Sequence, residues 1–575
     1  MELPVWSQVS CGDAEMPWPE NYPTSGWTYA DGDLTEYTRF GLRNLSATAL
    51  SVTCRLYRGN GLFMGETGIT VTAQGYAVLD STEIIRALFH HHGLGECVWE
   101  DPNGVPSLRC TSLLLGPLLY TTSKVHEIYF NGWPMTAPTT SPLQWPYWTV
   151  QGDPNPIWGW NSVDLTTEFF LSNPTTNSVQ PHLELYDSNN VRVVDRDLGK
   201  IEPGQTAYFP VQVYYQGSGT YGRAVISWSP SNAQLHACGR LFCSSDSDRN
   251  PLKRYAAVIP GANLQSSFLV PYWESWMVAG TTNRATRTFL SIANTSSYQY
   301  AWIEIQWTNL AAGTGGTCTL PSPGIGPGET RVLDLGELFA PGTNGNGYAT
   351  VRSTVFHGSD PLPVNVWCYL VQEDRNRYQG LIDRAACWEP LNGRESTPYE
   401  LGYWQQKADS AGSAERRVQF ILTNPGSSTA RVSIVLSESS SCAWTGTVSV
   451  DPGRIAFVNS DTFVPCTDTN VHEGWGRITW TGPTNLDIWP ILIQIHKDSP
   501  YRQAAWATIP EAVTVTTFSI STSECEAVAA DVPQDSSPPF ADLSWESTGD
   551  GGAVPECFDV QLAWHAKDNG SWSDW

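Results

Sequence analysis

The sequence predicts an all-β protein of four tandem β-sandwiches followed by an irregular C-terminal tail. The chain has 575 residues, which is more than a single hydrophobic core usually accommodates. Its 49 Gly and 40 Pro are spread along the chain, as expected for short strands joined by many turns. A strand–turn–strand pattern also recurs four times, with copies that begin at Phe40, Phe169, Thr288 and Gln419.

An asparagine ends the first strand of each copy and sets the length of the repeat. These residues are Asn44, Asn173, Asn294 and Asn424, at intervals of 129, 121 and 130 residues. The segment VQPHLELYD after Asn173 alternates apolar and polar residues, which indicates a strand with one buried face. We therefore expect sandwiches at 1–138, 139–262, 263–392 and 393–513, and an acidic tail at 514–575 that could supply assembly strands.

Other sequence features recur at the same interval as the asparagine. An aromatic opener precedes it, as Trp18 in the first copy and as Tyr-Trp at 147–148, 272–273 and 403–404 in the others. A turn follows, with Pro-Gly in the last three copies, and Pro-Gly suits a type II turn. Short helical turns are expected within Asp80–Phe89, with Ser81 or Thr82 as the cap, and within Leu335–Gly342, and a strand is expected within Thr514–Thr522.

This succession of motifs resembles the tandem immunoglobulin-like β-sandwich repeats of prokaryotic secreted and surface proteins. The residues that carry the resemblance are Leu171–Pro174, Leu185–Asp187, Pro203-Gly204 and Tyr221-Gly222, with counterparts at Leu422–Pro425, Pro452-Gly453 and Trp475-Gly476. The first copy departs most, because it lacks Asn-Pro and Pro-Gly and carries an insertion at 90–110. The resemblance implies immunoglobulin-like sandwiches and a structural or adhesive role outside the cytoplasm, without indicating a ligand.

The charge excludes some partners. The formal net charge is -25 and no Lys/Arg cluster interrupts it, so nucleic acid and anionic lipid are not expected partners. No run of about 18 apolar residues predicts a membrane span. The first twenty residues have neither a basic nor an apolar signal region, which leaves open whether a leader was removed. We expect an extracellular or cell-surface location.

The 13 cysteines favour disulfides formed in an oxidising compartment, although reduced, buried thiols would be the alternative. Cys11 with Cys54 and Cys368 with Cys387 are less constrained pairs. The local pairs that spacing suggests are Cys97 with Cys110, Cys238 with Cys243, Cys442 with Cys466, and Cys525 with Cys557.

Motifs for catalysis or cofactor binding do not recur. We find no GxSxG, HExxH or phosphate-binding Gly loop, so the prediction is a non-enzymatic protein without a cofactor. His90–His92 could bind a metal, but adjacent residues of a strand point to opposite faces. Calcium could bind acidic loops at Asp31 and Asp33 or at Asp246 and Asp248, which otherwise are solvated turns. Asn44, Asn294 and Asn569 match the N-glycosylation pattern.

The 26 tryptophans are the most informative excess. Most are expected in sandwich cores, but some fall in predicted inter-domain segments or in the tail. There they could pack between sandwiches, join neighbouring molecules or stack on sugars. The interface candidates are Trp148, Trp160, Trp273 and Trp276, with Trp545, Trp564, Trp572 and Trp575 in the tail.

These observations predict a structural protein that self-assembles into a surface filament, sheath or array, with other copies of itself as partner. Tail strands could add to a sandwich edge of the next subunit. The alternatives are an adhesin that binds surface glycans, and a phage decoration or tail protein.

Overall fold

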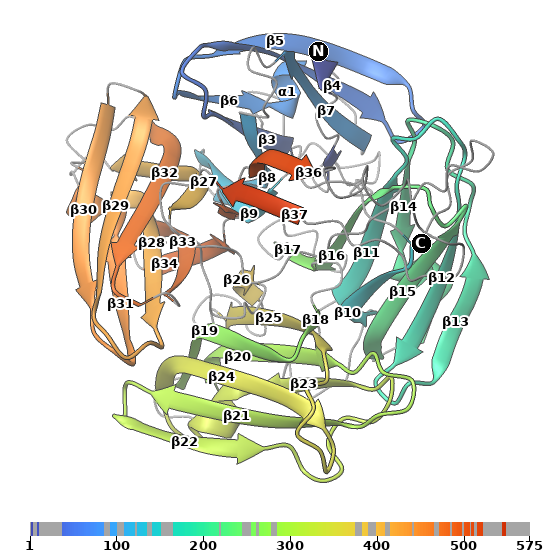
Figure 1. Cartoon of the computed structure of the whole chain (residues 1–575), viewed down its shortest axis with the longest axis vertical. Helices are drawn as coiled ribbons and strands as arrows, with labels where there is room; N and C mark the ends of the chain where they lie inside the picture. Colours follow the sequence, from blue (N-terminus) through green and yellow to red (C-terminus); the bar gives the residue numbers. More distant parts are fainter. Residues whose placement is uncertain are drawn as a thin grey trace, which may run out of the picture. The chain divides into compact units, whose positions relative to one another are not determined.

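The computed structural model confirms that the protein is all-β, with antiparallel sheets and a few helical turns (Figure 1). The chain divides into two compact units, Met1–Ile509 and Pro510–Trp575. The structure describes residues 2–3, 8–10, 37–84, 93–100, 108–120, 124–134, 141–150, 165–217, 220–243, 255–259, 264–277, 284–373, 382–388, 398–408, 414–439, 442–464, 471–483, 486–496, 499–505, 508–510, 515–520 and 543–547.

The first sandwich consists of two sheets with strand orders β1-β7-β4-β5 and β6-β3-β8-β9, and β2 also pairs with β7. Its core contains Leu42, Val52 and Trp99. The elements are β1 (Glu2–Leu3), β2 (Gln8–Ser10), β3 (Tyr37–Asn44), β4 (Leu50–Arg58), β5 (Phe63–Val71), β6 (Tyr76–Asp80), α1 (Ser81–Ile84), β7 (Gly93–Glu100), β8 (Leu108–Tyr120) and β9 (Lys124–Pro134).

The second sandwich has the strand orders β10-β15-β12-β13 and β14-β11-β16-β17. Side chains alternate along β12 and β15, so that one face of their sheet fills the core and the other meets solvent. The elements are β10 (Leu143–Thr149), β11 (Leu165–Ser172), β12 (Gln180–Asp187), β13 (Arg192–Asp197), β14 (Thr206–Pro210), α2 (Val211–Tyr214), β15 (Tyr221–Ser229), β16 (His236–Cys243) and β17 (Tyr255–Ile259).

In the third sandwich the strand β19 pairs with both β20 and β24 and so joins the two layers into one path, β18-β25-β20-β19-β24-β21-β22, with β23 on β20 and β26 on β25. The Asp334 carboxylate caps α3 by accepting from two backbone N–H groups. The elements are β18 (Leu264–Gln265), β19 (Ser267–Met277), β20 (Arg284–Ala293), β21 (Ala301–Asn309), β22 (Thr314–Thr319), β23 (Thr330–Asp334), α3 (Leu335–Phe339), β24 (Gly345–Val355), β25 (Val364–Glu373) and β26 (Ile382–Trp388).

The fourth sandwich repeats this plan, with the path β30-β29-β32-β27-β28-β33-β34, with β31 on β28 and β35 on β27. Figure 1 shows it in orange. The elements are β27 (Tyr399–Ala408), β28 (Ala414–Asn424), β29 (Ala430–Ser439), β30 (Cys442–Val450), β31 (Arg454–Asn459), η2 (Ser460–Thr462), β32 (Val471–Thr481), β33 (Asp487–His496), β34 (Ser499–Ala505) and β35 (Thr508–Pro510).

The second unit contains an antiparallel pair, β36 (Val515–Ile520) with β37 (Leu543–Ser547). The strand expected within Thr514–Thr522 is therefore present. The helical turns expected near residues 80 and 335 are also present as α1 and α3, whereas α2 was not expected from the sequence.

The recurring asparagine is a buried cross-link inside each sandwich. The side chains of Asn44, Asn173, Asn294 and Asn424 are all fully buried. In the second sandwich, Asn173 Nδ2 donates to the carbonyls of Asn177 at 2.8 Å and Ile201 at 3.0 Å, and its Oδ1 accepts from Thr175 N. The other three asparagines make the same kind of bonds. The amide therefore holds the turn after its own strand against a distant segment.

This burial corrects one sequence observation. Glycosylation attaches a bulky sugar to an accessible asparagine Nδ2. The Nδ2 atoms of Asn44 and Asn294 instead donate to backbone carbonyls inside the protein. The sequons at these two positions are therefore structural, and Asn569 lies outside the described residues.

Candidate functional site

The strand that ends at the recurring asparagine is buried on both faces, which places it at the centre of a joint between sandwiches. In β20, Leu290 belongs to the third core, whereas its neighbour Phe289 belongs to the second. In β28, Leu422 lies in the fourth core and Ile421 in the third. Because side chains alternate along a strand, one face of each strand fills its own sandwich and the other packs on the preceding one.

In the second–third and third–fourth joints, the aromatic opener supplies the other side of the contact, and a break in strand register accompanies it. The pairing of β10 with β15 shifts between Trp145 and Trp148. The same shift occurs in β19 and β27, between Val270 and Trp273 and between Leu401 and Trp404. A bulge interrupts the simple alternation of side chains. Two successive aromatic residues can therefore both be buried, in different places.

The tryptophan of the opener fills its own sandwich, and the tyrosine reaches the next one. Trp148 lies in the second core and donates from Nε1 to Tyr186 O at 2.9 Å. The adjacent Tyr147 stacks on Trp367 of the third sandwich, with ring centroids 5.4 Å apart. Tyr272 likewise meets Phe457 of the fourth sandwich edge-on at 5.5 Å. Such ring pairs add about 1 kcal/mol to the burial of their surfaces.

Carbonyl groups of the opener accept hydrogen bonds from the neighbouring sandwich. Ser291 Oγ donates to Pro146 O at 3.0 Å, and Thr423 Oγ1 donates to Pro271 O at 2.6 Å. Asn365 Nδ2 also donates across the joint, to Gln144 O at 3.1 Å. Pro146 and Pro271 lie where the strand register is interrupted, so these two bonds satisfy main-chain acceptors at the breaks in the ladder.

The Pro-Gly turns form a second contact in the joints, against a hairpin of the preceding sandwich. Thr206 N donates to Gly59 O at 2.9 Å, and Thr330 N donates to Ser188 O at 3.1 Å. Gly328 has a φ of 71° and approaches Asn190 so closely that a Cβ would lie 2.2 Å from it. The positive φ favours glycine there, and a larger residue would also force the Asn190 side chain to move.

The fourth sandwich also contacts the first. The guanidinium of Arg43 lies over the ring of Trp475, 3.5 Å from its centroid. Tyr76 and Val78 of β6 pack against the fourth core. Contacts thus link the first sandwich to the second, the second to the third, the third to the fourth, and the fourth back to the first.

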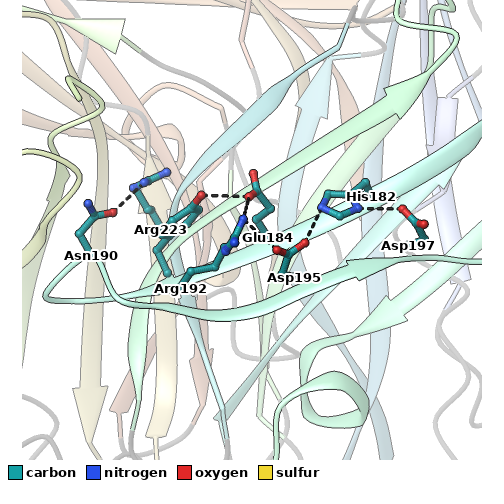
Figure 2. Close-up of polar contacts among 8 residues, drawn as sticks. His182, Glu184, Asn190, Arg192, Asp195, Asp197 and Arg223 are labelled. Carbon is teal, nitrogen blue, oxygen red and sulfur yellow. Dashed lines mark hydrogen bonds and ion pairs between the residues drawn. The ribbon is translucent and has the colours of Figure 1, made fainter.

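A ladder of charged side chains crosses the outer face of the second sandwich (Figure 2). His182 and Glu184 come from β12, and Arg192, Asp195 and Asp197 from β13. His182 Nδ1 lies 2.8 Å from Asp197 Oδ1, and its Nε2 lies 3.0 Å from Asp195 Oδ1. Arg192 Nη1 bonds both Glu184 at 3.0 Å and Asp195 at 2.8 Å. Because carboxylates only accept, both histidine contacts are hydrogen bonds only when both ring nitrogens carry protons.

The ladder continues towards β15 through an aromatic ring. Tyr186 donates to Glu184 at 3.1 Å, and Arg223 lies over the Tyr186 ring at 3.8 Å. Arg223 also donates to Gly328 O of the third sandwich and to Asn190. Burial raises the pKa of Tyr186, helped by the Glu184 carboxylate. Burial lowers the pKa of Arg223. This end of the ladder therefore belongs to the joint between the second and third sandwiches.

The ladder includes a possible ligand set for a metal ion. Among the residues that the structure describes, ligand atoms of His182, Glu184 and Asp195 lie within 4.8 Å of one another. Arg192 already places a cation on both carboxylates, and its pKa is raised chiefly by the bond to Glu184. A metal would have to displace this guanidinium. The arrangement is best explained as cross-strand stabilisation of the β12–β13 hairpin.

Two buried titratable groups occupy equivalent register positions in different sandwiches. His236 lies opposite Ser172, and Asp487 lies opposite Thr423. Ser172 and Thr423 are the residues directly before the recurring asparagine of their sandwiches. Burial lowers the pKa of His236 to about 4 and raises the pKa of Asp487 to about 7. Both shifts favour the neutral form, as expected where no solvent stabilises the charge.

The predicted interface tryptophans lie in different environments in the structure. Trp148 and Trp273 are fully buried in the cores of the second and third sandwiches, so these two rings pack inside the protein. Trp276, at the end of β19, is 37% exposed and donates to Glu274 at 3.3 Å. Trp545 lies on β37 opposite Phe518. Trp160, Trp564, Trp572 and Trp575 lie outside the described residues.

Strand register corrects three of the cysteine pairings. Cys238 and Cys243 lie five residues apart on β16, about 17 Å along an extended strand, and a disulfide spans at most about 7 Å between Cα atoms. Cys387 lies opposite Tyr369, whereas Cys368 lies opposite Trp388, so Cys368 and Cys387 are not register partners. Cys97 lies directly opposite Cys54, whereas Cys110 lies in the other sheet, opposite Leu42.

Of the remaining predicted site residues, Cys442 lies within the described part of the chain. Cys442 begins β30, and its Sγ lies 3.9 Å from Glu438. Outside the described residues lie Cys11, Cys466, Cys525 and Cys557, the histidines His90–His92, and the acidic loops of Asp31, Asp33, Asp246 and Asp248.

Comparison with known proteins adds no identification. The sequence matches no protein-family model, and no curated protein is similar to it. In the described part of the chain, none of the helices has the length and apolar character needed to cross a membrane.

Proposed function

We propose that this protein is a non-enzymatic, extracellular structural protein that self-assembles, with the four-sandwich unit as its body and Pro510–Trp575 as the connecting element. The observation that supports this proposal most is the use of the recurring residues. The buried asparagines, the Tyr-Trp openers and the Pro-Gly turns hold each sandwich and its joints together. A repeat that encodes structure at every copy is typical of a building block.

Since sandwich-to-sandwich contacts form within one chain, assembly would use other surfaces. Two sheet edges are suited to it. The edge strands β22 (TGGTCT) and β30 (CAWTGTVSV) contain no charged residue. The edge strand β13 (RVVDRD), in contrast, contains four charged residues. Charged side chains protect an edge against pairing with another chain. The edges β22 and β30 are therefore candidates to accept a strand from another molecule.

The second unit offers a strand of matching character. The segment VTTFSI of β36 is uncharged and rich in residues with high β-propensity. Its described partner is β37 alone, and an isolated two-stranded sheet is marginally stable in water. Addition of such a strand to the edge of another copy is a recurrent mode of assembly.

Electron microscopy and sedimentation of the full chain test the proposal. The wild-type protein should form ordered filaments or sheets. Thr447→Lys places a charge on β30 and should abolish or strongly weaken assembly, whereas Val191→Lys adds the same charge at another exposed position and should not. Removal of 510–575 should give folded, unassembled protein. Dispersed monomers of the wild type at high concentration, or normal assembly of the truncated chain, would contradict the proposal.

A glycan-binding adhesin is the second candidate, and one observation favours it. The partly exposed ring of Trp276 is fixed by its bond to Glu274, which is itself held by Tyr272 at 2.6 Å. A rigid, exposed indole can stack on a sugar ring. Glycan-array binding that is lost in Trp276→Ala with unchanged folding would favour this function over assembly.

A further inference from the structure

Two cysteines of the first sandwich face each other across adjacent strands. Cys54 of β4 and Cys97 of β7 are direct register partners. Their Sγ atoms lie 3.0 Å apart, and each side chain is only 1% exposed. Both belong to the first core, among residues such as Leu42, Val52 and Trp99.

The backbone geometry at this pair suits a disulfide. Directly opposed residues of an antiparallel pair have Cα atoms about 4.5–5.5 Å apart, within the range of about 4.4–6.8 Å found across disulfides. An S–S bond is about 2.05 Å long, so the two sulfur atoms need to approach by about 1 Å. A rotation about the side-chain bonds supplies such a shift while the strands keep their register.

We propose that Cys54 and Cys97 form a cross-strand disulfide when the protein folds in an oxidising environment. This inference is independent of the proposed self-assembly. The oxidant is a low-molecular-weight disulfide. One cysteine thiolate attacks it to give a mixed disulfide and one released thiol. The second thiolate then attacks the mixed disulfide, the protein S–S bond forms, and a second thiol molecule leaves. Two cysteine thiols are oxidised and one disulfide molecule is reduced to two thiols.

The surroundings determine when this exchange takes place. The bond to Cys97, together with burial, raises the pKa of the Cys54 thiol, and the attacking species is the thiolate. Exchange therefore takes place before β4 and β7 close into the core or when they open, and a bond once formed is shielded from reductants.

Peptide mapping of the full chain distinguishes the candidate pairings. Trypsin places Cys11, Cys54, Cys97 and Cys110 on the separate peptides 1–39, 44–55, 87–109 and 110–124. The protein is folded with reduced and oxidised glutathione, alkylated in denaturant without reductant, digested and analysed by mass spectrometry. We expect peptide 44–55 linked to peptide 87–109. Linkage of 87–109 to 110–124, linkage of 1–39 to 44–55, or alkylation of both Cys54 and Cys97 would overturn the proposal.

A stability measurement gives an independent readout. Reductant applied during unfolding should lower the melting temperature of the first sandwich in the wild-type protein. The double variant Cys54→Ser, Cys97→Ser should lose this response, whereas Cys318→Ser, at the distant edge strand β22, should keep it. An undiminished response in the double variant would assign the effect to other cysteines and contradict the proposal.

Discussion

The joint between the third and fourth sandwiches and the joint between the fourth and first use the same repeat position with different chemistry. The position is the residue just before the recurring asparagine. In the fourth sandwich it is Thr423, whose hydroxyl donates to Pro271 O at 2.6 Å. In the first it is Arg43, whose guanidinium covers the ring of Trp475. The first copy is the most divergent in sequence, yet it keeps the location of its joint. The location is thus set by the fold, and the side chain there can vary.

The two contacts contribute different free energies, and different changes disrupt them. A hydroxyl-to-carbonyl bond contributes about 1 kcal/mol, and its loss leaves a buried acceptor unsatisfied. A desolvated guanidinium–indole contact contributes about 2 kcal/mol and depends on a cation remaining buried. Arg43 is held for this by bonds from Nη1 to Asn44 O at 2.7 Å and to Gly75 O at 3.1 Å.

The largest expected effect is at the opener of the third–fourth joint. Tyr272→Ala removes a buried ring from Phe457 and leaves the buried Glu274 carboxylate without its phenol donor. We expect the free energy of unfolding to fall by about 4 kcal/mol. Tyr298→Ala removes a ring that is 77% exposed and should change it little. Denaturant unfolding measures both variants. Equal changes in the free energy of unfolding would contradict a contribution of Tyr272 to the joint.

The same joint should also respond to pH. Asp487 lies opposite Thr423, and its pKa is raised to about 7, above the ordinary value near 4. As the pH rises from about 4 to about 7, the unfolded chain ionises this carboxyl before the folded protein does, so stability falls across this window. Asp487→Asn should remove this loss and stabilise the protein at pH 8, by on the order of 4 kcal/mol.

Burial of His236, in the second sandwich, makes stability depend on pH in the opposite direction. Its pKa is lowered to about 4, so stability is lost as the pH falls from about 6.5 towards 4. Unfolding curves from pH 4 to 8 for Asp487→Asn and for His236→Gln separate the two contributions. A pH profile that Asp487→Asn leaves unchanged would show that this carboxyl is ionised in the folded protein.

The smallest expected effect is the coupling across the fourth–first joint. A double-mutant cycle of Arg43→Ala and Trp475→Ala should give an interaction energy of about 1–2 kcal/mol. A control cycle combines Arg43→Ala in the fourth–first joint with Thr423→Val in the third–fourth joint, and it should be additive because the two residues lie in different joints. Additivity in both cycles would mean that the guanidinium contributes no direct contact.

The sequence predicted the regular parts of this protein and missed what depends on pairing. Alternation in VQPHLELYD and Pro-Gly at the turns identified strands and turns, since both depend on local chemistry. The separate destinations of Tyr147 and Trp148 depend on a bulge, which only the partner strand reveals. The facing of Cys54 and Cys97 depends on strand order, which spacing along the chain does not report. The alternate positions of His182, Glu184 and Tyr186 place their side chains on one face of a strand. Identifying their partners on β13 needs the strand register, which the sequence does not give.

The contact between the first and fourth sandwiches within one chain is tested most directly by hydrogen exchange on Trp475→Ala. This substitution lies in β32 of the fourth sandwich, and its expected effect reaches β3 (Tyr37–Asn44) and β6 (Tyr76–Asp80) of the first. Amides of both strands should exchange faster than in the wild type, to the same extent at low and high protein concentration. Faster exchange confined to the fourth sandwich, or an effect that appears only at high concentration, would contradict a joint formed within the chain.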